Sequence, residues 1–195
     1  LPKEIMYAFA DLLFFVGYYV IKYRKKVVYA NLKQSFPDIS PEERSVIAKR
    51  FFRHLSDVMI EDIAMLHMKP KRLEGFVHVK NPEFLNELYQ QKKNVMGMLG
   101  HYGNWELLTT IPRYTPYTIL SVYKPLKNSF FNAKVYEMRK RFNEVPIPMK
   151  QAYRYIAQFE NSGKPYVVGM VADQRPSGSH PKYWTTFLNQ DTSFF

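Results

Sequence analysis

The chain changes its pattern of apolar and polar positions along its length. Residues 5–21 are apolar apart from Asp11, whereas residues 41–68 repeat their apolar positions at helical spacing. The first run predicts a helix that is apolar on all sides, and the second predicts an amphipathic helix. A shorter helical stretch over residues 26–36 is expected to stop before Pro37, because proline breaks helices.

The start of the long helix carries three local signals. Ser40 can cap the first turn, Pro41 suits the first helical position, and Glu43 completes a capping box with Ser40. The helix is expected to run to about Met68, ahead of Pro70.

From residue 76 onward, short apolar runs rich in β-branched and aromatic residues alternate with helical stretches. The expected strands cover residues 76–79, 94–99, 117–122 and 166–172. The expected helices cover residues 82–92, 103–111, 128–142 and 150–161. This alternation predicts an α/β fold in which helices flank a mixed, mostly parallel sheet. The stretch from Gln174 to Lys182, with its prolines and glycine, is expected to be a loop.

The first apolar run is slightly shorter than the about 20 residues that a membrane-spanning helix needs. The cations that follow it, from Lys22 to Lys26, would place that end on the cytoplasmic side. A buried first helix of a soluble domain is the alternative, and a signal peptide is disfavoured because its charges would precede the apolar run. We expect residues 1–24 to be a membrane-associated helix and residues 25–195 to form the main domain, which continues beyond this sequence.

Composition narrows the classes of function. Hydrophobic residues make up 46% of the chain and aromatic residues 16%, which excludes a disordered protein. The absence of cysteine excludes a disulfide framework, a thiolate metal site and a cysteine nucleophile. The net charge of +11 predicts an anionic partner, and charge alone leaves phospholipid headgroups, nucleic acid and an acidic carrier protein open.

Two places in the chain combine a histidine with a glutamate five positions later. They are His101 with Glu106 and His78 with Glu83, whereas chance predicts about 0.4 such matches. A histidine with a carboxylate in reach is the usual general base for activating a hydroxyl. The spacing alone is weak evidence, because side chains five residues apart on a continuous helix point apart. We expect His78 to be structural, since it lies inside the predicted strand 76–79.

The local sequence favours the pair at His101. Gly100 ends an apolar strand, Gly103 permits a turn, and Asn104 can cap the helix that follows. This turn would bring His101 to the carboxyl end of a strand, where open α/β sheets place their ligand sites.

These residues belong to a series of blocks in which the chain resembles a known family. The blocks are Arg24 to Leu32, Ser35 to Pro37, His101 to Glu106, Tyr123 to Asn128, Arg139 to Phe142, Ala172 to Pro176 and Phe187 to Gln190. Together they resemble the bacterial lipid A biosynthesis acyltransferases, the late lauroyl and myristoyl transferases, over essentially the whole chain. Two positions differ from the family pattern: Lys124 stands where many members have Arg, and Asn189 stands where Gly is usual.

The resemblance implies a glycerolipid-acyltransferase-like fold and a reaction. The reaction is transfer of a fatty acyl chain from an acyl carrier protein thioester to a hydroxyl group of a lipid A precursor, without a cofactor. It implies a location at the cytoplasmic face of the inner membrane of a Gram-negative bacterium. In this mechanism His101 takes the proton of the acceptor hydroxyl, and Glu106 orients the imidazole. The family continues past Phe195, so part of the sheet and of the acyl pocket is expected to follow.

One group of candidate binding residues follows the third predicted strand. Tyr123, Lys124, Lys127 and Asn128 are expected to lie near the acceptor, where the cations would meet its phosphates. A solvated basic loop is the alternative. A lysine in place of arginine at Lys124 loses the bidentate geometry with which arginine holds phosphate.

A second group lies later in the chain. Arg139 and Arg141 are expected to attract the acidic carrier or the phosphorylated sugar, and a plain surface face is equally compatible with them. Asp173 and Gln174 end the last predicted strand, on what should be the same sheet edge as His101. They are therefore site candidates, with loop capping as the alternative.

Other functions compete with this prediction. One alternative is an enzyme that uses the same pair of residues to acylate another glycolipid or an aminolipid. From a different class, a basic chain rich in aromatics is compatible with non-enzymatic binding of a membrane or of nucleic acid. The apolar run at 5–21 favours lipid, so we expect no nucleic-acid partner. A metal centre is not expected, because His101 and Glu106 supply only two ligands and the sequence suggests no third.

Overall fold

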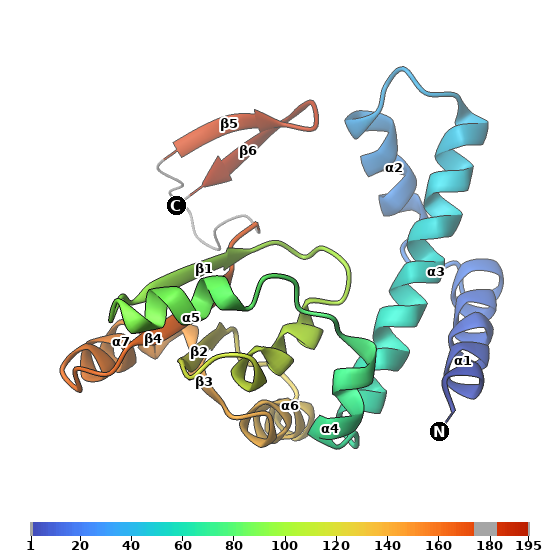
Figure 1. Cartoon of the computed structure of the whole chain (residues 1–195). Helices are drawn as coiled ribbons and strands as arrows, with labels where there is room; N and C mark the ends of the chain where they lie inside the picture. Colours follow the sequence, from blue (N-terminus) through green and yellow to red (C-terminus); the bar gives the residue numbers. More distant parts are fainter. Residues whose placement is uncertain (1, 174–182, 195) are drawn as a thin grey trace. The chain divides into compact units, whose positions relative to one another are not determined.

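A computed structural model describes residues 2–173 and 183–194, and the chain forms two compact units. The first unit contains Leu1–Ile63 and Gln174–Phe195, and the second contains Ala64–Asp173. The first is helical with one β-hairpin, whereas the second is an α/β unit (Figure 1). The loop predicted from Gln174 to Lys182 lies outside the described residues.

The first unit confirms the predicted helices. Its elements are α1 (Lys3–Phe15), the π-helix η1 (Val16–Val20), α2 (Lys25–Ser35), α3 (Pro41–Met65, which ends in the second unit), β5 (Tyr183–Phe187) and β6 (Gln190–Phe194). The capping box of α3 forms as expected. The backbone N–H of Ser40 donates to Glu43 Oε2 at 2.9 Å, and the backbone N–H of Glu43 donates to Ser40 Oγ at 3.1 Å.

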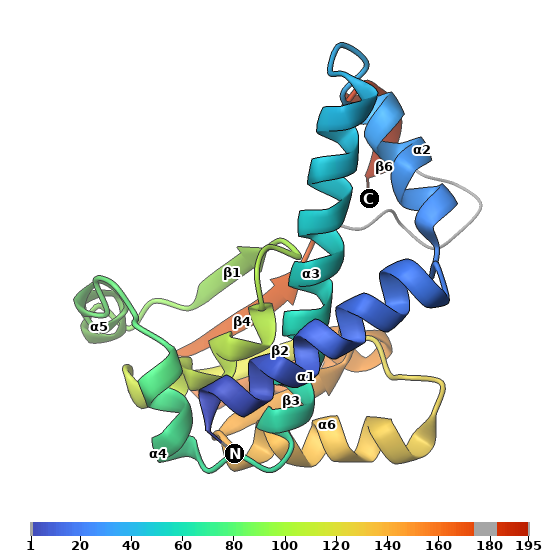
Figure 2. The same cartoon turned by 90° about the vertical axis from the view of Figure 1, so that its right-hand side faces the viewer.

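Helix α1 lies beside α3 in both views of the molecule (Figures 1 and 2). In η1, which continues α1, the ring of Tyr18 packs edge to face on the Phe52 ring of α3 at 5.3 Å between their centroids. Asp11, the polar exception in the apolar run, accepts a hydrogen bond of 2.8 Å from Arg53. Both charged side chains are largely exposed, so this ion pair contributes at most about 1 kcal/mol to stability, and apolar packing holds the two helices together.

The first apolar run does not form a single straight helix. It passes from α1 into η1, and the chain then turns through Lys22 and Arg24, which have φ angles of 55° and 49°. Within the described residues, no helix alone has the length and hydropathy to cross a membrane. The segments Lys3–Val20 and Lys25–Ser35, bent by 87° from each other, meet those requirements together.

The second unit is built on a four-stranded parallel sheet. Its strands are β1 (Val95–Leu99), β2 (Thr118–Tyr123), β3 (Glu144–Pro148) and β4 (Tyr166–Val171). Its helices are α4 (Pro70–Leu73), α5 (Glu83–Gln90), α6 (Ser129–Arg141) and α7 (Ala152–Glu160), with 3₁₀ turns at η2 (Glu74–Phe76), η3 (Trp105–Arg113) and η4 (Met149–Gln151). The strand order is β1-β4-β2-β3, and every neighbouring pair is parallel. The predicted flanked, mostly parallel sheet is therefore confirmed.

Helices cover both faces of this sheet, because side chains alternate along each strand. Leu120 and Val168 are buried with apolar residues of α7, such as Ile156. Ile119 and Val167, their neighbours in sequence, are buried instead with residues of α5. A third cluster joins Met138 and Phe142, at the end of α6, to Met65 and Leu73. Packing on both faces of the sheet positions the carboxyl ends of the strands.

One predicted strand is absent, and one strand of the sheet was not predicted. Residues 76–79 form no strand: Val77 is extended, but Asn81 turns the chain with a φ angle of 52° and the segment pairs with no other strand. His78 is therefore exposed and outside the sheet. The prediction also missed β3, because Pro146 and Pro148 make it look like a loop. Proline lacks the N–H that a central strand needs, and β3 tolerates it at the edge of the sheet.

The hairpin of β5 and β6 was not predicted either. Its two strands are joined by Leu188 and Asn189, which have φ angles of 50° and 57°. Two successive positive φ angles are typical of a tight hairpin turn. Asparagine tolerates this region better than most residues, which suits Asn189 to the second position of the turn.

Candidate active site at the carboxyl edge of the sheet

The register of the sheet brings His101 and Asp173 together. Strands β1 and β4 are parallel neighbours, and Leu99 is aligned with Val171. Two residues further along each strand stand His101 and Asp173. The backbone N–H of His101 donates to Asp173 Oδ2 at 2.7 Å, and its ring Nδ1 lies 2.6 Å from Asp173 Oδ1. One carboxylate thus holds both the backbone and the imidazole of the histidine.

The close approach of Asp173 depends on a glycine. A Cβ atom added to Gly100 would lie 3.2 Å from Asp173 Oδ2, which is tighter than an ordinary contact. Beyond His101 the chain turns at Gly103, with a φ angle of 60°, and Asn104 Oδ1 accepts from the backbone N–H of Glu106 at 3.1 Å. The predicted turn and helix cap are both confirmed, although the helix that follows is the 3₁₀ helix η3.

Hydrogen bonding controls the charge of Asp173. Partial burial raises the pKa of this carboxyl, but hydrogen bonds from the ring and backbone of His101 outweigh burial and hold its pKa below the usual range. The two side chains are 31% and 46% exposed, so the pair is open to solvent and to a substrate. The ring of Trp105 meets the imidazole edge to face, with centroids 4.5 Å apart.

The carboxylate of Glu106 is held by a different residue. Arg139 donates to Glu106 Oε1 at 2.6 Å and to Oε2 at 3.3 Å, and these side chains are only 14% and 17% exposed. The Arg139 guanidinium also lies 5.4 Å from the centroid of the Tyr123 ring. The structure therefore places Asp173 on Nδ1 of His101 and pairs Glu106 with an arginine of α6. The predicted orienting role of Glu106 stays a prediction.

A buried carboxyl group next to this pair was missed in the sequence. Glu144, the first residue of β3, is 9% exposed. Burial raises its pKa and the negative charge of Glu106 raises it further, while Ser121, Arg139 and Thr109 oppose the rise. The sequence feature that could have identified Glu144 is an acidic residue at the start of an apolar run. The prolines in that run made the segment look like a loop.

The other predicted site residues are dispersed. Lys124 is exposed just after β2, at the same sheet edge as His101. Asn128 caps α6, since its Oδ1 accepts from the backbone N–H of Phe131 at 3.1 Å. Arg141 donates to the carbonyl oxygens of Met65 and Leu66 at 2.8 and 3.0 Å, which gives it a structural task. Gln174 lies outside the described residues.

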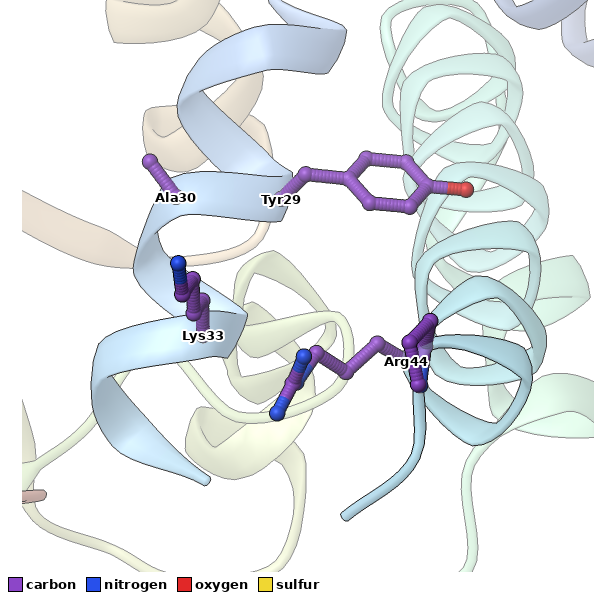
Figure 3. Close-up of a pocket in the computed structure, with 5 residues that line it drawn as sticks. Tyr29, Ala30, Lys33 and Arg44 are labelled. Carbon is purple, nitrogen blue, oxygen red and sulfur yellow. The ribbon is translucent and has the colours of Figure 1, made fainter. Parts of the chain in front are cut away.

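A hollow of about 300 Å³ in the first unit offers a different surface. It is lined by Tyr29, Ala30, Lys33, Pro41 and Arg44. Figure 3 shows the Arg44 side chain reaching from α3 toward α2. Its guanidinium donates to the carbonyl oxygen of Pro37 at 2.8 Å and so supports the turn between these helices. The lining contains neither a histidine nor a carboxylate, so the candidate chemistry lies at the sheet edge.

Within the described residues, no group of three or more metal-ligating side chains comes together. A comparison with protein families matches residues 1–192 to a family model described as bacterial lipid A biosynthesis acyltransferase. A search of curated proteins found no match.

Proposed function

The chain belongs to the bacterial lipid A biosynthesis acyltransferase family, and from this premise we propose that it transfers a fatty acyl chain from an acyl carrier protein thioester to a hydroxyl of a lipid A precursor. The family establishes an acyltransferase of lipid A biosynthesis, with lipid A chemistry on the acceptor side. The carrier-bound donor, the site residues and the location at the cytoplasmic face of the inner membrane are the proposal.

The contact between His101 and Asp173 supports the catalytic part of this proposal most directly. An ionised carboxylate on Nδ1 favours the tautomer that carries hydrogen on Nδ1 and its lone pair on Nε2. Nε2 is then the basic atom. The same carboxylate stabilises the positive charge that the ring acquires when it takes a proton.

The reaction balances with His101 as the only proton carrier. The imidazole takes the proton of the acceptor hydroxyl as that oxygen bonds to the thioester carbonyl carbon. The carbon–sulfur bond then breaks, and the imidazolium returns the proton to the leaving thiolate. Acid–base catalysis of this kind contributes about 10²–10⁴-fold, so positioning of both substrates supplies much of the remainder.

The ion pair of Glu106 and Arg139 supports the candidate active site. It joins the first turn of η3 to α6, and Trp105, next to Glu106, contacts the imidazole. We propose that this pair fixes the position of η3 and therefore of the turn that presents His101. Lys124, exposed at the same edge, is proposed to meet a phosphate of the acceptor.

The experiment is an assay of the complete protein with acyl carrier protein thioesters and a tetra-acylated lipid A precursor, read by mass spectrometry of the lipid. We expect a product heavier by one acyl group. His101→Ala should abolish it, and His78→Ala, an exposed histidine outside the sheet, is the matched control. Glycolipid and aminolipid acceptors in parallel reactions test the competing acceptors. Full activity of a folded His101→Ala protein would refute the mechanism.

A further inference from the structure

The segment that enters α6 presents large apolar side chains and cations together on the surface. Leu126, Phe130 and Phe131 are 50%, 63% and 53% exposed. Residues 124–136 contain three lysines and no acidic residue. We name this the aromatic–lysine surface, made of Lys124, Leu126, Lys127, Phe130, Phe131 and Lys134.

The aromatic–lysine surface is a fixed structure rather than a loose loop. The backbone N–H of Leu126 donates to Asn132 Oδ1 at 2.9 Å, and Asn128 caps the helix. The rings of Phe130 and Phe131 pack edge to face at 5.6 Å, and Lys134 Nζ lies 5.6 Å from the Phe130 centroid. Ordered apolar groups that stay in water are costly, so this arrangement indicates a partner.

Its place in the fold relates it to the candidate active site. The loop leaves β2 at the sheet edge that carries His101 and Asp173. Figure 2 shows that it extends away from the sheet before α6 begins. Phe130 lies about 14 Å along the helix from Arg139, at 1.5 Å of rise per residue. A partner bound to this loop would lie toward the carboxyl ends of the strands, where His101 and Asp173 also stand.

We propose that the aromatic–lysine surface inserts into the headgroup region of a bilayer that contains anionic lipids. Aromatic and aliphatic side chains interleaved with lysines suit that interface, where the rings enter the acyl boundary and the lysines meet negative headgroups. This membrane-insertion proposal rests on the proposed function in one respect, that the lipid acceptor lies in such a bilayer. Insertion is measured without acyl transfer, so the two proposals fail separately.

Helix α5 offers a matched comparison. Phe84 is 60% exposed, nearly the same as Phe130. It is flanked by Glu83 and Glu87, and no lysine or arginine occurs from residue 81 to residue 91. An exposed phenylalanine with negative neighbours should be repelled by an anionic bilayer, so Phe84 tests whether exposure alone causes insertion.

The absence of cysteine in the sequence allows the test to be made with single labels. Phe130→Cys and Phe84→Cys, each in the full chain, carry an environment-sensitive fluorophore. They are mixed with vesicles of phosphatidylcholine, or of phosphatidylcholine and phosphatidylglycerol in equal parts. We expect a blue shift at position 130 with the anionic vesicles only, weakened by salt, and none at position 84.

Charge variants extend the test on the labelled Phe130→Cys chain. Lys127→Gln with Lys134→Gln should lower the lipid affinity that the label reports by roughly fivefold per lysine. Lys164 is exposed just before β4, at the amino ends of the strands. Lys164→Gln should therefore leave the lipid affinity unchanged. Equal responses of the two labels, or of the lysine variants and their control, would overturn the proposal. A blue shift at position 130 with an acidic carrier protein instead of vesicles would assign the surface to protein docking and also overturn it.

Discussion

Two side-chain pairs in the second unit have the same short contact distance but different surroundings. His101 and Asp173 meet at 2.6 Å at the sheet edge, and Glu106 of η3 and Arg139 of α6 meet at 2.6 Å. The first pair is about one-third to one-half exposed, whereas the second is less than one-fifth exposed. A pair in contact with water can exchange a proton with a substrate. A pair shielded from water resists separation, because each charge alone would be poorly solvated.

The difference in exposure indicates that the two pairs have different roles. The exposed pair should control the reaction and contribute little to stability, since solvent screens it. The buried pair should control stability and act on the reaction only through the position of η3. Substitutions in each pair test whether the exposed pair is catalytic and whether the buried pair is structural.

The largest expected effect is on activity. Asp173→Asn keeps the shape of the side chain but removes the charge that stabilises the imidazolium, so we expect kcat to fall by about 10²–10⁴-fold. The free energy of unfolding should change by less than about 0.5 kcal/mol. Kinetics and urea unfolding of the same preparation check both. If Glu106→Gln lowers kcat this far and Asp173→Asn does not, Glu106 is the orienting carboxylate that its spacing from His101 predicted.

The next effect is on stability. Arg139→Met keeps the aliphatic stem but leaves Glu106 without its cation beside the buried Glu144, so we expect a loss of about 3 kcal/mol, the low end for a broken buried pair. Lys140→Met is the matched control, because Lys140 is exposed and its nearest carboxylate, that of Glu137, lies 3.9 Å away. Urea midpoints of the two variants measure the difference. Equal stability would show that the Glu106 pair is not structural.

These two pairs also show how far sequence reasoning reaches. The local turn at Gly103 and Asn104 was predictable, because φ preferences and helix caps are encoded by neighbouring residues. The same local reasoning assigned Glu106 as the partner of His101, since it lies only five positions away. The carboxylate on Nδ1 comes from Asp173, which follows β4 and was predicted to lie at the same sheet edge as His101, but not to contact its ring. Only the register of β1 with β4 brings them together, and no local pattern specifies a register between distant strands.

Tertiary contacts also explain the other errors. β3 was missed because its prolines are tolerated only at a sheet edge, and its edge position follows from the strand order. Glu144 was missed with it. For Arg141, charge left substrate binding and a plain surface face equally open; its guanidinium donates to the carbonyl oxygens of Met65 and Leu66, and substrate binding stays a prediction. Charge indicates that a side chain needs polar partners, and packing decides which partners it finds.

A smaller effect on activity is expected from Gly100→Ala. The new methyl group would stand 3.2 Å from Asp173 Oδ2 and push the carboxylate away from His101, so kcat should fall about tenfold while KM stays near its original value. Gly97→Ala on the same strand is the control, because its nearest neighbour would lie at 3.7 Å, an ordinary contact. A Gly100→Ala enzyme as active as Gly97→Ala would show that the carboxylate position does not matter.

The smallest expected effect is on the pH dependence of stability, through Glu144 beside the buried pair of Glu106 and Arg139. Burial raises the pKa of Glu144 in the folded protein above its ordinary value in the unfolded chain. Between these two pKa values the folded state keeps a proton that the unfolded state has released. The contribution of Glu144 to stability is therefore most favourable below the ordinary pKa and is lost as the pH rises through the folded pKa.

Glu144→Gln removes this titration and the buried charge that remains above it. The variant should match the original protein at acidic pH, where both carry a neutral side chain, and exceed it in stability at neutral pH. Glu137→Gln, on the exposed side of α6, should change neither value. Urea unfolding at several pH values measures the slope. If Glu144→Gln is instead less stable at neutral pH, the ionised Glu144 strengthens the hold on Arg139, and the buried network consists of three charges rather than one pair.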